Sequence, residues 1–388
     1  MTRNWSGKAA IVGIHEYPSR REANIHPREI QARSILAALA DAGLTPADVD
    51  GLAVSGAATE PAEDAGMSPI VDMAEYLGIS PRYLDSTDLG GAGPVAHVAH
   101  AAAAVAAGHA NVVVVSYAAN PYFLHAAPPT RPTPGPLQFE APYGLTTVAK
   151  YAFAAQRHMA EFGTTAEQLA EIAVTCRAHA QHNPDARYRD PLTVDDVMSS
   201  PIIASPLHRL DCCVVTTGGG AVVVTSDRRA RECAAEAAIL LGAGEAVSHS
   251  VISEMDRFTV TPAAASGPRA FAQAGIQPGD IDVAQLYDSF TITTLLALED
   301  LGFCDKGDGG KFVLNQNITL GGTLPINTDG GGLSSNHPGR RGIFTVIEAV
   351  RQLRGHGVGV QVPNARLALA HGSGGELSTA ATLILGKE

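Results

Sequence analysis

Two side chains of this sequence, His337 and Tyr287, are of types and in positions that suit proton transfer. His337 lies in a loop rich in glycine, and histidine is the side chain that changes charge closest to neutral pH. Tyr287 ends an apolar segment expected to be a strand, and side chains at such strand ends project into a crevice. Together an imidazole and a phenol could move a proton or stabilise an oxyanion. Each alone would more often be structural, and Asp288 is expected to be a helix N-cap or turn residue.

Two glycine-rich loops precede expected helices and are the second candidate feature. They are residues 88–94 (DLGGAGP) and residues 327–339 (NTDGGGLSSNHPG). The free N–H groups of a helix N-terminus favour an anion or an oxyanion. A lone loop of this kind more often makes only a tight turn. Because the two loops occupy matching points of a duplicated chain, we favour a shared site.

The duplication is visible in the sequence. Residues 40–50 (ADAGLTPADVD) align with residues 272–282 (AQAGIQPGDID) at a constant offset of 232, with six of the eleven positions identical. In each copy a glycine, Gly43 or Gly275, stands where a left-handed helix C-cap is expected, and a proline follows. The expected halves are residues 1–235 and 236–388.

The order of the expected elements predicts a layered α/β protein. Continuous apolar segments such as residues 111–116, separated by helices, indicate sheets covered on both faces. Residues 120–210 have no counterpart in the second half, and we expect an insertion that lies over a site. It contains proline-rich turns and two expected helices, over residues 146–162 and 165–182.

The composition excludes several classes of protein. The chain has 388 residues, of which 45% are hydrophobic, so it can bury a large core. The net charge of −12 and the absence of basic runs argue against nucleic acid as a partner. No segment has the length of a signal peptide core or a membrane span, so we expect a cytoplasmic protein. The five cysteines have no paired spacing, and we expect reduced thiols and no metal site, with Cys212 and Cys213 buried as small apolar residues.

With these residues in place, the sequence resembles the thiolase superfamily, specifically the sterol-carrier-protein-X type thiolases and the lipid-transfer-protein type aldolases that degrade steroid side chains. The resemblance implies a duplicated five-layered α-β-α-β-α fold, a homodimer and an acyl-CoA substrate. It spans nearly the whole chain and rests on these segments: AAIVGIHEYP, DAGLTPADVDGL, AEFGTTAEQLAEIAVTCRAHAQHNP, SPLHRLDCCVVTTGGGAVVV, YDSFTITTLLALEDLGFCDKGDGGKFV, NTDGGGLSSNHPG and ALAHGSGGELSTAATLILG.

The resemblance also implies roles for individual residues. His337 matches the histidine of the family's GHP-type motif, and Tyr287 matches the first position of the motif that reads NEAF or HDCF. In thiolases these two positions build an oxyanion hole. His371 begins the C-terminal glycine-rich loop and is the third expected catalytic residue. The residues expected to bind substrate through the loop backbones are Gly91, Ala92, Gly93, Gly331, Gly332 and Gly374.

The sequence departs from the thiolase pattern at the nucleophile. Ala92 stands about where thiolases place a reactive cysteine, and no cysteine lies in either glycine-rich loop. Covalent acyl-enzyme chemistry needs such a nucleophile. The steroid aldolases also lack it and carry a tyrosine at the position of Tyr287, but they have a second tyrosine where this chain has His337.

We therefore expect a retro-aldol cleavage of a β-hydroxyacyl-CoA, in which Tyr287, with a lowered pKa or through a water, accepts the β-hydroxyl proton. His337 and the loop N–H groups would hold the thioester oxygen, and a water near His371 would protonate the enolate. The substrate would be a steroid or similar side-chain CoA thioester. Two alternatives stay open: an acetyl-CoA acetyltransferase or thiolase acting on β-ketoacyl-CoA, and a non-catalytic acyl-CoA-binding subunit.

The expected partners follow from the same resemblance. No cofactor is expected apart from the CoA of the substrate. A small OB-fold protein with a zinc ribbon is expected to help hold the acyl-CoA. Arg340 and Arg341 are candidates for binding the CoA phosphates, although such a pair is usually an exposed, solvated helix face.

Overall fold

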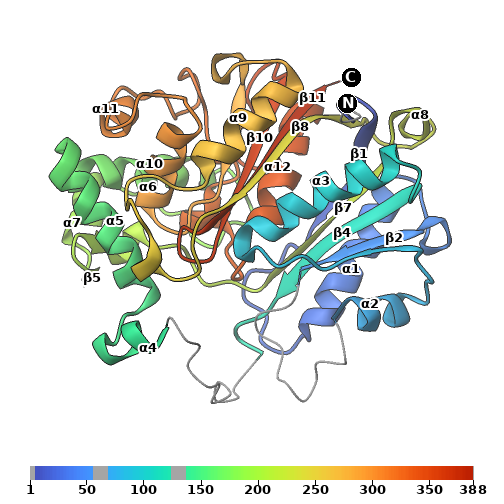
Figure 1. Cartoon of the computed structure of the whole chain (residues 1–388), viewed down its shortest axis with the longest axis horizontal. Helices are drawn as coiled ribbons and strands as arrows, with labels where there is room; N and C mark the ends of the chain where they lie inside the picture. Colours follow the sequence, from blue (N-terminus) through green and yellow to red (C-terminus); the bar gives the residue numbers. More distant parts are fainter. Residues whose placement is uncertain (1–4, 56–68, 124–136, 388) are drawn as a thin grey trace.

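The computed structural model describes residues 5–55, 69–123 and 137–387 (Figure 1). The strands are β1 (Ala9–Glu16), β2 (Gly51–Val54), β3 (Tyr83–Asp85), β4 (Val112–Ala119), β5 (Ile202–Ala204), β6 (Leu207–His208), β7 (Gly218–Ser226), β8 (Ala238–Val247), β9 (Val283–Leu286), β10 (Leu367–Gly374) and β11 (Thr379–Lys387). The α-helices are α1 (Pro27–Asp41), α2 (Pro69–Leu77), α3 (Gly93–Ala106), α4 (Leu137–Glu140), α5 (Thr147–Phe162), α6 (Ala166–Ala180), α7 (Val194–Ser199), α8 (Asp227–Ala230), α9 (Ala263–Ala274), α10 (Thr291–Asp300), α11 (Gly309–Leu314) and α12 (Gly342–Arg354).

In the described residues, nine strands form one sheet, and its strand order is symmetric about the β1–β8 pair except for β3 at one edge. The order is β3-β2-β4-β7-β1-β8-β11-β10-β9, and β1 and β8 pair antiparallel where the two halves meet. At one end β2 and β4 are parallel and β4 and β7 antiparallel. At the other end β9 and β10 are parallel and β10 and β11 antiparallel. Eight of the nine strands therefore form two copies of one arrangement, and β3 at the edge has no counterpart among the described strands.

The repeated sequence segments form the same local structure in both copies. Gly43 and Gly275 have φ angles of +72° and +73°, in the left-handed region that glycine adopts without a steric penalty. A short 3₁₀ turn follows each, Pro46–Asp48 in the first copy and Pro278–Asp280 in the second, and both turns begin with a capping box. The glycine and proline of each copy thus end one helix and start the same turn.

An aspartate after each turn connects neighbouring strands. Asp50 accepts hydrogen bonds from the N–H groups of Asn111 and Val112, at 2.7 and 2.9 Å, where β4 begins. Asp282 accepts two equivalent bonds, at 2.8 and 2.9 Å, from the residues that lead into β10. The aspartates that the two copies share therefore align parallel strand pairs at opposite ends of the sheet.

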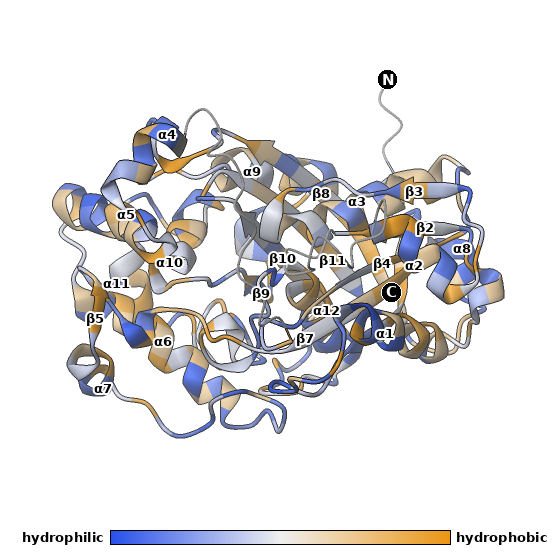
Figure 2. Cartoon of the chain, turned by 90° about the horizontal axis from the view of Figure 1, so that it is seen from below, coloured by the Kyte–Doolittle hydropathy of each residue, from blue (hydrophilic) through white to orange (hydrophobic). Residues whose placement is uncertain are grey.

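Helices α3 and α12 form the middle layer between the two halves of the sheet (Figure 1). Each contacts strands of both halves, and nearly all residues of both helices are buried. Helix α1 covers the outer face of the first half, against β1, β4 and β7, and α9 covers the outer face of the second half, against β8 and β11. This is the predicted α-β-α-β-α arrangement. Figure 2 shows the hydrophobic character of β4, as expected for a strand covered on both faces.

The insertion after β4 packs on the second half of the molecule, although it belongs to the first half of the sequence. Helices α5 and α6 share a hydrophobic cluster with α10, in which Leu169 and Ile172 lie among Leu295 and Leu296. Figures 1 and 2 both place α5, α6 and α7 at one end of the molecule, together with α10. The two helices predicted here are confirmed as α5 and α6. The proline-rich residues 127–136 lie outside the described residues.

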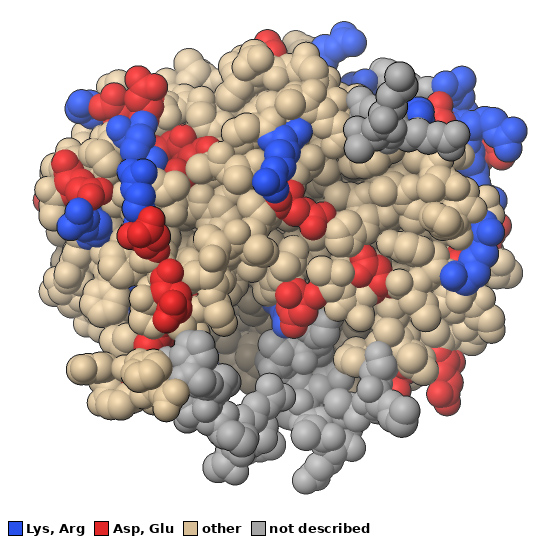
Figure 3. Space-filling model, viewed as in Figure 1, with Lys and Arg blue, Asp and Glu red and all other residues tan. Residues whose placement is uncertain are grey.

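The surface carries charges of both signs. On the face shown in Figure 3, groups of Lys and Arg side chains lie beside Asp and Glu side chains, for example at the left and near the upper centre, with large uncharged areas between them. Among the described ranges, no helix combines the length and the hydropathy that crossing a membrane requires.

Candidate active site

Tyr287 lies immediately after β9, at the carboxyl end of the parallel strand pair of the second half. Its backbone N–H donates to the carbonyl of His371 on β10 at 3.1 Å, so the strand ladder fixes where the side chain starts. The phenol oxygen lies 3.0 Å from Nε2 of His337 and 3.3 Å from the carbonyl oxygen of Gly339. The structure thus brings the two predicted proton-transfer side chains into direct hydrogen-bond contact.

The chain around His337 is held by residues of the first half. The His337 N–H donates to Oγ1 of Thr216 at 2.9 Å. The Tyr117 hydroxyl lies 3.4 Å from the carbonyl oxygen of Pro338, and Tyr117 is fully buried on β4. Sequence reasoning did not identify Thr216 or Tyr117, because nothing in their local sequence indicates contact with a loop more than a hundred residues away.

Both side chains of the pair are neutral at pH 7. Burial, together with the nearby Arg341 guanidinium, lowers the pKa of His337 to about 4. Burial raises the pKa of the Tyr287 phenol well above its ordinary value, and Cys213 and Tyr151 act in the same direction. The prediction that the site lowers the pKa of Tyr287 is therefore wrong: Tyr287 is only 5% exposed, and little water is available to stabilise a phenolate.

The first glycine-rich loop lies against the ring of Tyr287. A Cβ atom added at Gly91 would stand 2.4 Å from Cε2 of Tyr287 and 2.4 Å from the Ser373 carbonyl oxygen, so only glycine fits there. Ala92 is fully buried and occupies the cap position of α3. The N-terminus of α3 therefore lies beside the phenol, and its cap residue carries the methyl group of Ala92 at the position where the resemblance to thiolases would place a cysteine.

The other glycines named from the sequence mark close backbone approaches. A Cβ at Gly374 would lie 2.0 Å from the Leu89 carbonyl oxygen, and one at Gly93 would lie 3.1 Å from the Ser55 hydroxyl. Gly374 thus allows the end of β10 to pack directly on the loop that enters α3; His371 to Gly374, expected as a loop, belong to this strand. Both positions are explained by packing, and neither requires a substrate.

The second glycine-rich loop does not present its N–H groups in the expected way. The Gly331 N–H donates to Asp329 at 2.9 Å and the Gly332 N–H donates to Asp288 at 2.7 Å. Both glycines belong to a short π-helix, Gly331–Ser335. The expectation that Gly331 and Gly332 hold the thioester oxygen is corrected, because carboxylates of the protein already accept from them.

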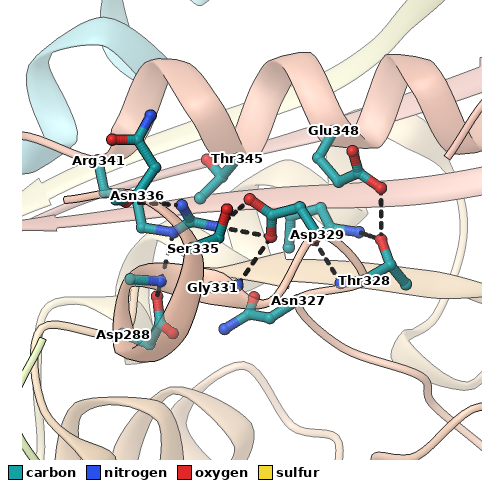
Figure 4. Close-up of polar contacts among 12 residues, drawn as sticks. Asp288, Asn327, Thr328, Asp329, Gly331, Ser335, Asn336, Arg341, Thr345 and Glu348 are labelled. Atoms are coloured by element: carbon teal, nitrogen blue, oxygen red, sulfur yellow. Dashed lines mark hydrogen bonds and ion pairs between the residues drawn. The ribbon is translucent and has the colours of Figure 1, made fainter. Parts of the chain in front are cut away.

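Asp288 and Arg341 also differ from expectation. Asp288 is fully buried and is not the cap of α10, a position that Phe290 occupies. Arg341 is fully buried and forms ion pairs with Asp329 at 2.7 Å and with Asp288 at 3.1 Å. Figure 4 shows this guanidinium between the two carboxylates. Arg341 is therefore not on a solvated helix face, and Arg340 pairs with Asp88 of the first glycine-rich loop at 2.7 Å.

His371 points away from the Tyr287–His337 pair. Its Nδ1 lies 3.0 Å from the hydroxyl of Thr382, which in turn bonds the Ser266 hydroxyl of α9 at 2.9 Å. Since α9 covers the outer face of the sheet and the next residue, Gly372, lies against Ala92 of α3, the imidazole faces the outer layer. The expected water near His371 is not supported; only the carbonyl of this residue reaches the site, through Tyr287.

The cysteines are not placed as nucleophiles. Burial raises the pKa of Cys176, Cys212, Cys213 and Cys304. Cys212 and Cys213 are half-buried rather than fully buried, and Cys212 packs against the hydrophobic cluster that α5, α6 and α10 share. In the part of the chain that the structure describes, no group of three His, Cys, Asp or Glu side chains could hold a metal ion.

Known proteins resemble this chain over most of its length. A family model described as "Thiolase C-terminal domain-like" matches residues 244–387. The 17-hydroxy-3-oxo-4-pregnene-20-carboxyl-CoA lyase of Mycobacterium tuberculosis is 36% identical over 370 residues, covering 91% of this chain and 93% of that protein. An acetyl-CoA acetyltransferase of Methanothermobacter thermautotrophicus is 31% identical over 381 residues, covering 97% of this chain and 99% of that protein.

A solved structure shows the same likeness in three dimensions. The structure of a protein named "Ltp2-ChsH2(DUF35) aldolase" aligns with a TM-score of 0.90 at 34% sequence identity, and the alignment covers 99% of both chains.

Proposed function

The chain belongs to the thiolase superfamily, and from this premise we propose that it is a carbon–carbon lyase that cleaves a β-hydroxyacyl-CoA by a retro-aldol reaction. The M. tuberculosis relative is named a lyase of a steroid carboxyl-CoA, and the similar solved structure is named an aldolase. The observation that carries the proposal is the Tyr287–His337 contact of 3.0 Å beside a helix N-terminus that offers Ala92 and no thiol. The substrate class is a steroid or similar side-chain CoA thioester.

The first step removes the proton of the β-hydroxyl group. The oxygen of Tyr287 accepts this proton while the phenol passes its own proton to Nε2 of His337, 3.0 Å away. This relay avoids a free phenolate, which burial makes unfavourable. Burial and Arg341 also disfavour the His337 imidazolium, so His337 holds the proton only until it returns to the substrate carbon. The substrate oxygen becomes a carbonyl as the Cα–Cβ bond breaks.

The bond cleavage leaves an enolate on the thioester of the acyl-CoA. The α3 N-terminus, which lies beside Tyr287 through Gly91, carries the positive end of a helix dipole and favours the developing oxyanion. The proton then returns from His337 through Tyr287 to Cα. The products are a ketone or aldehyde and a shorter acyl-CoA, and no free CoA is consumed.

The test is product analysis by mass spectrometry with matched β-hydroxyacyl-CoA and β-ketoacyl-CoA substrates, of steroid and smaller acyl types. We expect release of a ketone or aldehyde without added CoA, and a decrease of about 10²–10⁴-fold in kcat for Tyr287→Phe. Cleavage of the ketoacyl substrate that depends on added CoA would contradict the proposal. A protein that binds both substrates and converts neither would be an acyl-CoA-binding subunit.

An acyltransferase is the second candidate, and the similarity to an acetyl-CoA acetyltransferase favours it. It needs a nucleophile, however, and Ala92 stands at the N-terminus of α3. Treatment with iodoacetamide separates the two functions, because alkylation would inactivate a thiolase. We expect full activity to survive alkylation, since burial raises the pKa of the thiols near the site.

We also propose that the protein acts as a homodimer with a DUF35 partner. The similar solved aldolase carries a DUF35 protein, ChsH2, in its name. A small OB-fold protein with a zinc ribbon would supply contacts to the CoA phosphates in place of Arg340 and Arg341, since both are paired with carboxylates. Co-purification followed by light scattering tests both the partner and the dimer.

A further inference from the structure

A second connection joins Tyr287 to His337, and it runs through buried charged side chains. Asp288 follows Tyr287 directly in the chain. Its carboxylate accepts the N–H groups of Gly332 at 2.7 Å and Leu333 at 3.1 Å. The residue that anchors the strand end of the site is thus bonded to the loop that leads to His337.

Arg341 closes the connection on the far side of that loop. Its guanidinium bonds the Asp329 carboxylate at 2.7 and 2.8 Å and the carbonyl oxygen of Asn336 at 2.9 Å (Figure 4). Its Nε lies 3.1 Å from the Asp288 carboxylate. Because Asn336 directly precedes His337, the loop is fixed at both ends of the segment that carries the imidazole.

The glycines of the loop are explained by this contact. A Cβ at Gly331 would lie 2.1 Å from the carboxylate of Asp288, and Gly331 has a φ angle of +68°. A Cβ at Gly332 would lie 3.0 Å from the same carboxylate. The loop therefore packs closely on Asp288, and two residues of its short π-helix have glycine where a Cβ would meet this side chain.

We propose that Asp288 is a positioning residue of the lyase, which sets the distance between the Tyr287 phenol and the His337 imidazole without contacting the substrate. The inference rests on the proposed function. One end of the connection is covalent, because Asp288 and Tyr287 are neighbours, and the other end is the Asp288–Arg341 contact with the loop. Loss of the carboxylate charge releases the loop and lengthens the hydrogen bond across which the proton moves.

The surroundings of Asp288 give the proposal a pH signature. The groups that face its carboxylate are Arg341 and Asp329 from the loop, Cys176 from α6 and Cys213 from the segment before β7. Burial raises the pKa of Asp288 to about 6, although Arg341 acts in the opposite direction. The pKa of His337 is about 4, so a decrease of kcat/KM at low pH (the acid limb of the pH profile) caused by Asp288 and one caused by His337 occur at different pH values.

The experiment is the pH profile of kcat/KM for the wild type, Asp288→Asn and the matched control Asp300→Asn, each in complex with the partner protein. Asp300, the last residue of α10, is also a buried carboxylate. It pairs with Lys306 at 2.6 Å and lies away from the loop. We expect an acid limb near pH 6 in the wild type and in Asp300→Asn. In Asp288→Asn we expect this limb to disappear, kcat to fall by roughly 10²-fold and KM to stay unchanged.

A folded Asp288→Asn protein with wild-type kcat, or one that keeps the limb near pH 6, would overturn the proposal. If Asp288→Asn does not fold, Arg341→Lys tests the proposal, because lysine keeps the positive charge and loses the guanidinium that contacts both Asp288 and Asp329. We expect a smaller fall in kcat, and a shift in the pH at which kcat/KM begins to decrease. A crystal structure of the variant separates this proposal from the proposed function. If the wild type cleaves no β-hydroxyacyl-CoA the function fails, whereas an unchanged 3.0 Å Tyr287–His337 contact in the variant refutes the positioning role.

Discussion

The two glycine-rich loops stand at equivalent ends of the central helices and are built in different ways. The backbone of the loop that enters α3 packs directly on its neighbours, and Gly91 lies against the Tyr287 ring. The loop before α12 is organised by buried charges, with Arg341 between Asp288 and Asp329. The two helix N-termini thus share a scaffold, while Tyr287 and His337, which form the 3.0 Å contact, both come from the second half.

The largest effect is expected from a comparison of two histidines of the second half, the half-buried His337 and the buried His371. His337→Gln removes the proton acceptor of Tyr287 and should lower kcat by about 10²–10⁴-fold. His371→Gln should lower kcat by less than about tenfold, because the His371 ring faces Thr382 and the backbone carbonyl that anchors Tyr287 remains. Steady-state kinetics on both variants measures the difference. Equal losses would place the His371 ring at the site after all.

The next effect concerns stability and separates the two neighbouring arginines. Arg341→Met removes one partner of a fully buried ion-pair network and should cost about 3–5 kcal/mol in the free energy of unfolding. Arg340→Met removes a pair with a largely exposed aspartate, Asp88, and should cost about 0–1 kcal/mol. Urea denaturation followed by circular dichroism measures both. A cost for Arg341→Met as small as that for Arg340→Met would mean that the buried charges do not hold the loop.

A smaller effect is expected from adding one methyl group to the first loop. Gly91→Ala places a Cβ 2.4 Å from the Tyr287 ring, so the ring must move, and we expect kcat to fall by roughly 10²-fold. Gly279→Ala is the matched control, because a Cβ there meets no atom within 4 Å. Kinetics and melting temperatures of both variants test the contact. A Gly91→Ala enzyme as active as Gly279→Ala would show that the ring position is not critical.

The smallest effect is the pH dependence of stability contributed by His371. Burial lowers the pKa of His371 to about 4, so the unfolded state binds more protons between pH 4 and 6.5. The contribution is fully present above pH 6.5 and is lost as the pH falls towards 4. Urea denaturation at several pH values should show a weaker acid destabilisation in His371→Gln. An identical pH dependence in wild type and variant would contradict the shift.

The parts of the molecule that the sequence predicted are those with local signals. Gly43, Gly275 and the turns after them could be predicted because both positions have the positive φ angle that glycine adopts without a steric penalty. Tyr287 and His337 could be paired because the resemblance to thiolases implies that both positions build one oxyanion hole. The layered α/β class followed from continuous apolar segments separated by helices, and the five-layered arrangement was implied by the resemblance.

The parts that could not be predicted depend on long-range contacts. Asp288 has the sequence context of a cap, and only its distance to Gly332, 44 residues later, reveals its role. The direction of the His371 ring depends on which face of β10 it occupies, and the register alone decides this. Burial also reversed the expected shift of the Tyr287 pKa, and burial is a property of the packed molecule.

Helix α6 comes from the first half of the chain and supports the loop of the second half. Arg177 donates to the Ser334 hydroxyl at 2.8 Å, and Asn183, just after the helix, donates to the Asp329 carbonyl at 2.9 Å. Because both side chains come from residues 120–210, residues 236–388 alone would lack these two contacts. We therefore expect the loop that carries His337 to be fully held only when both parts of the chain are present.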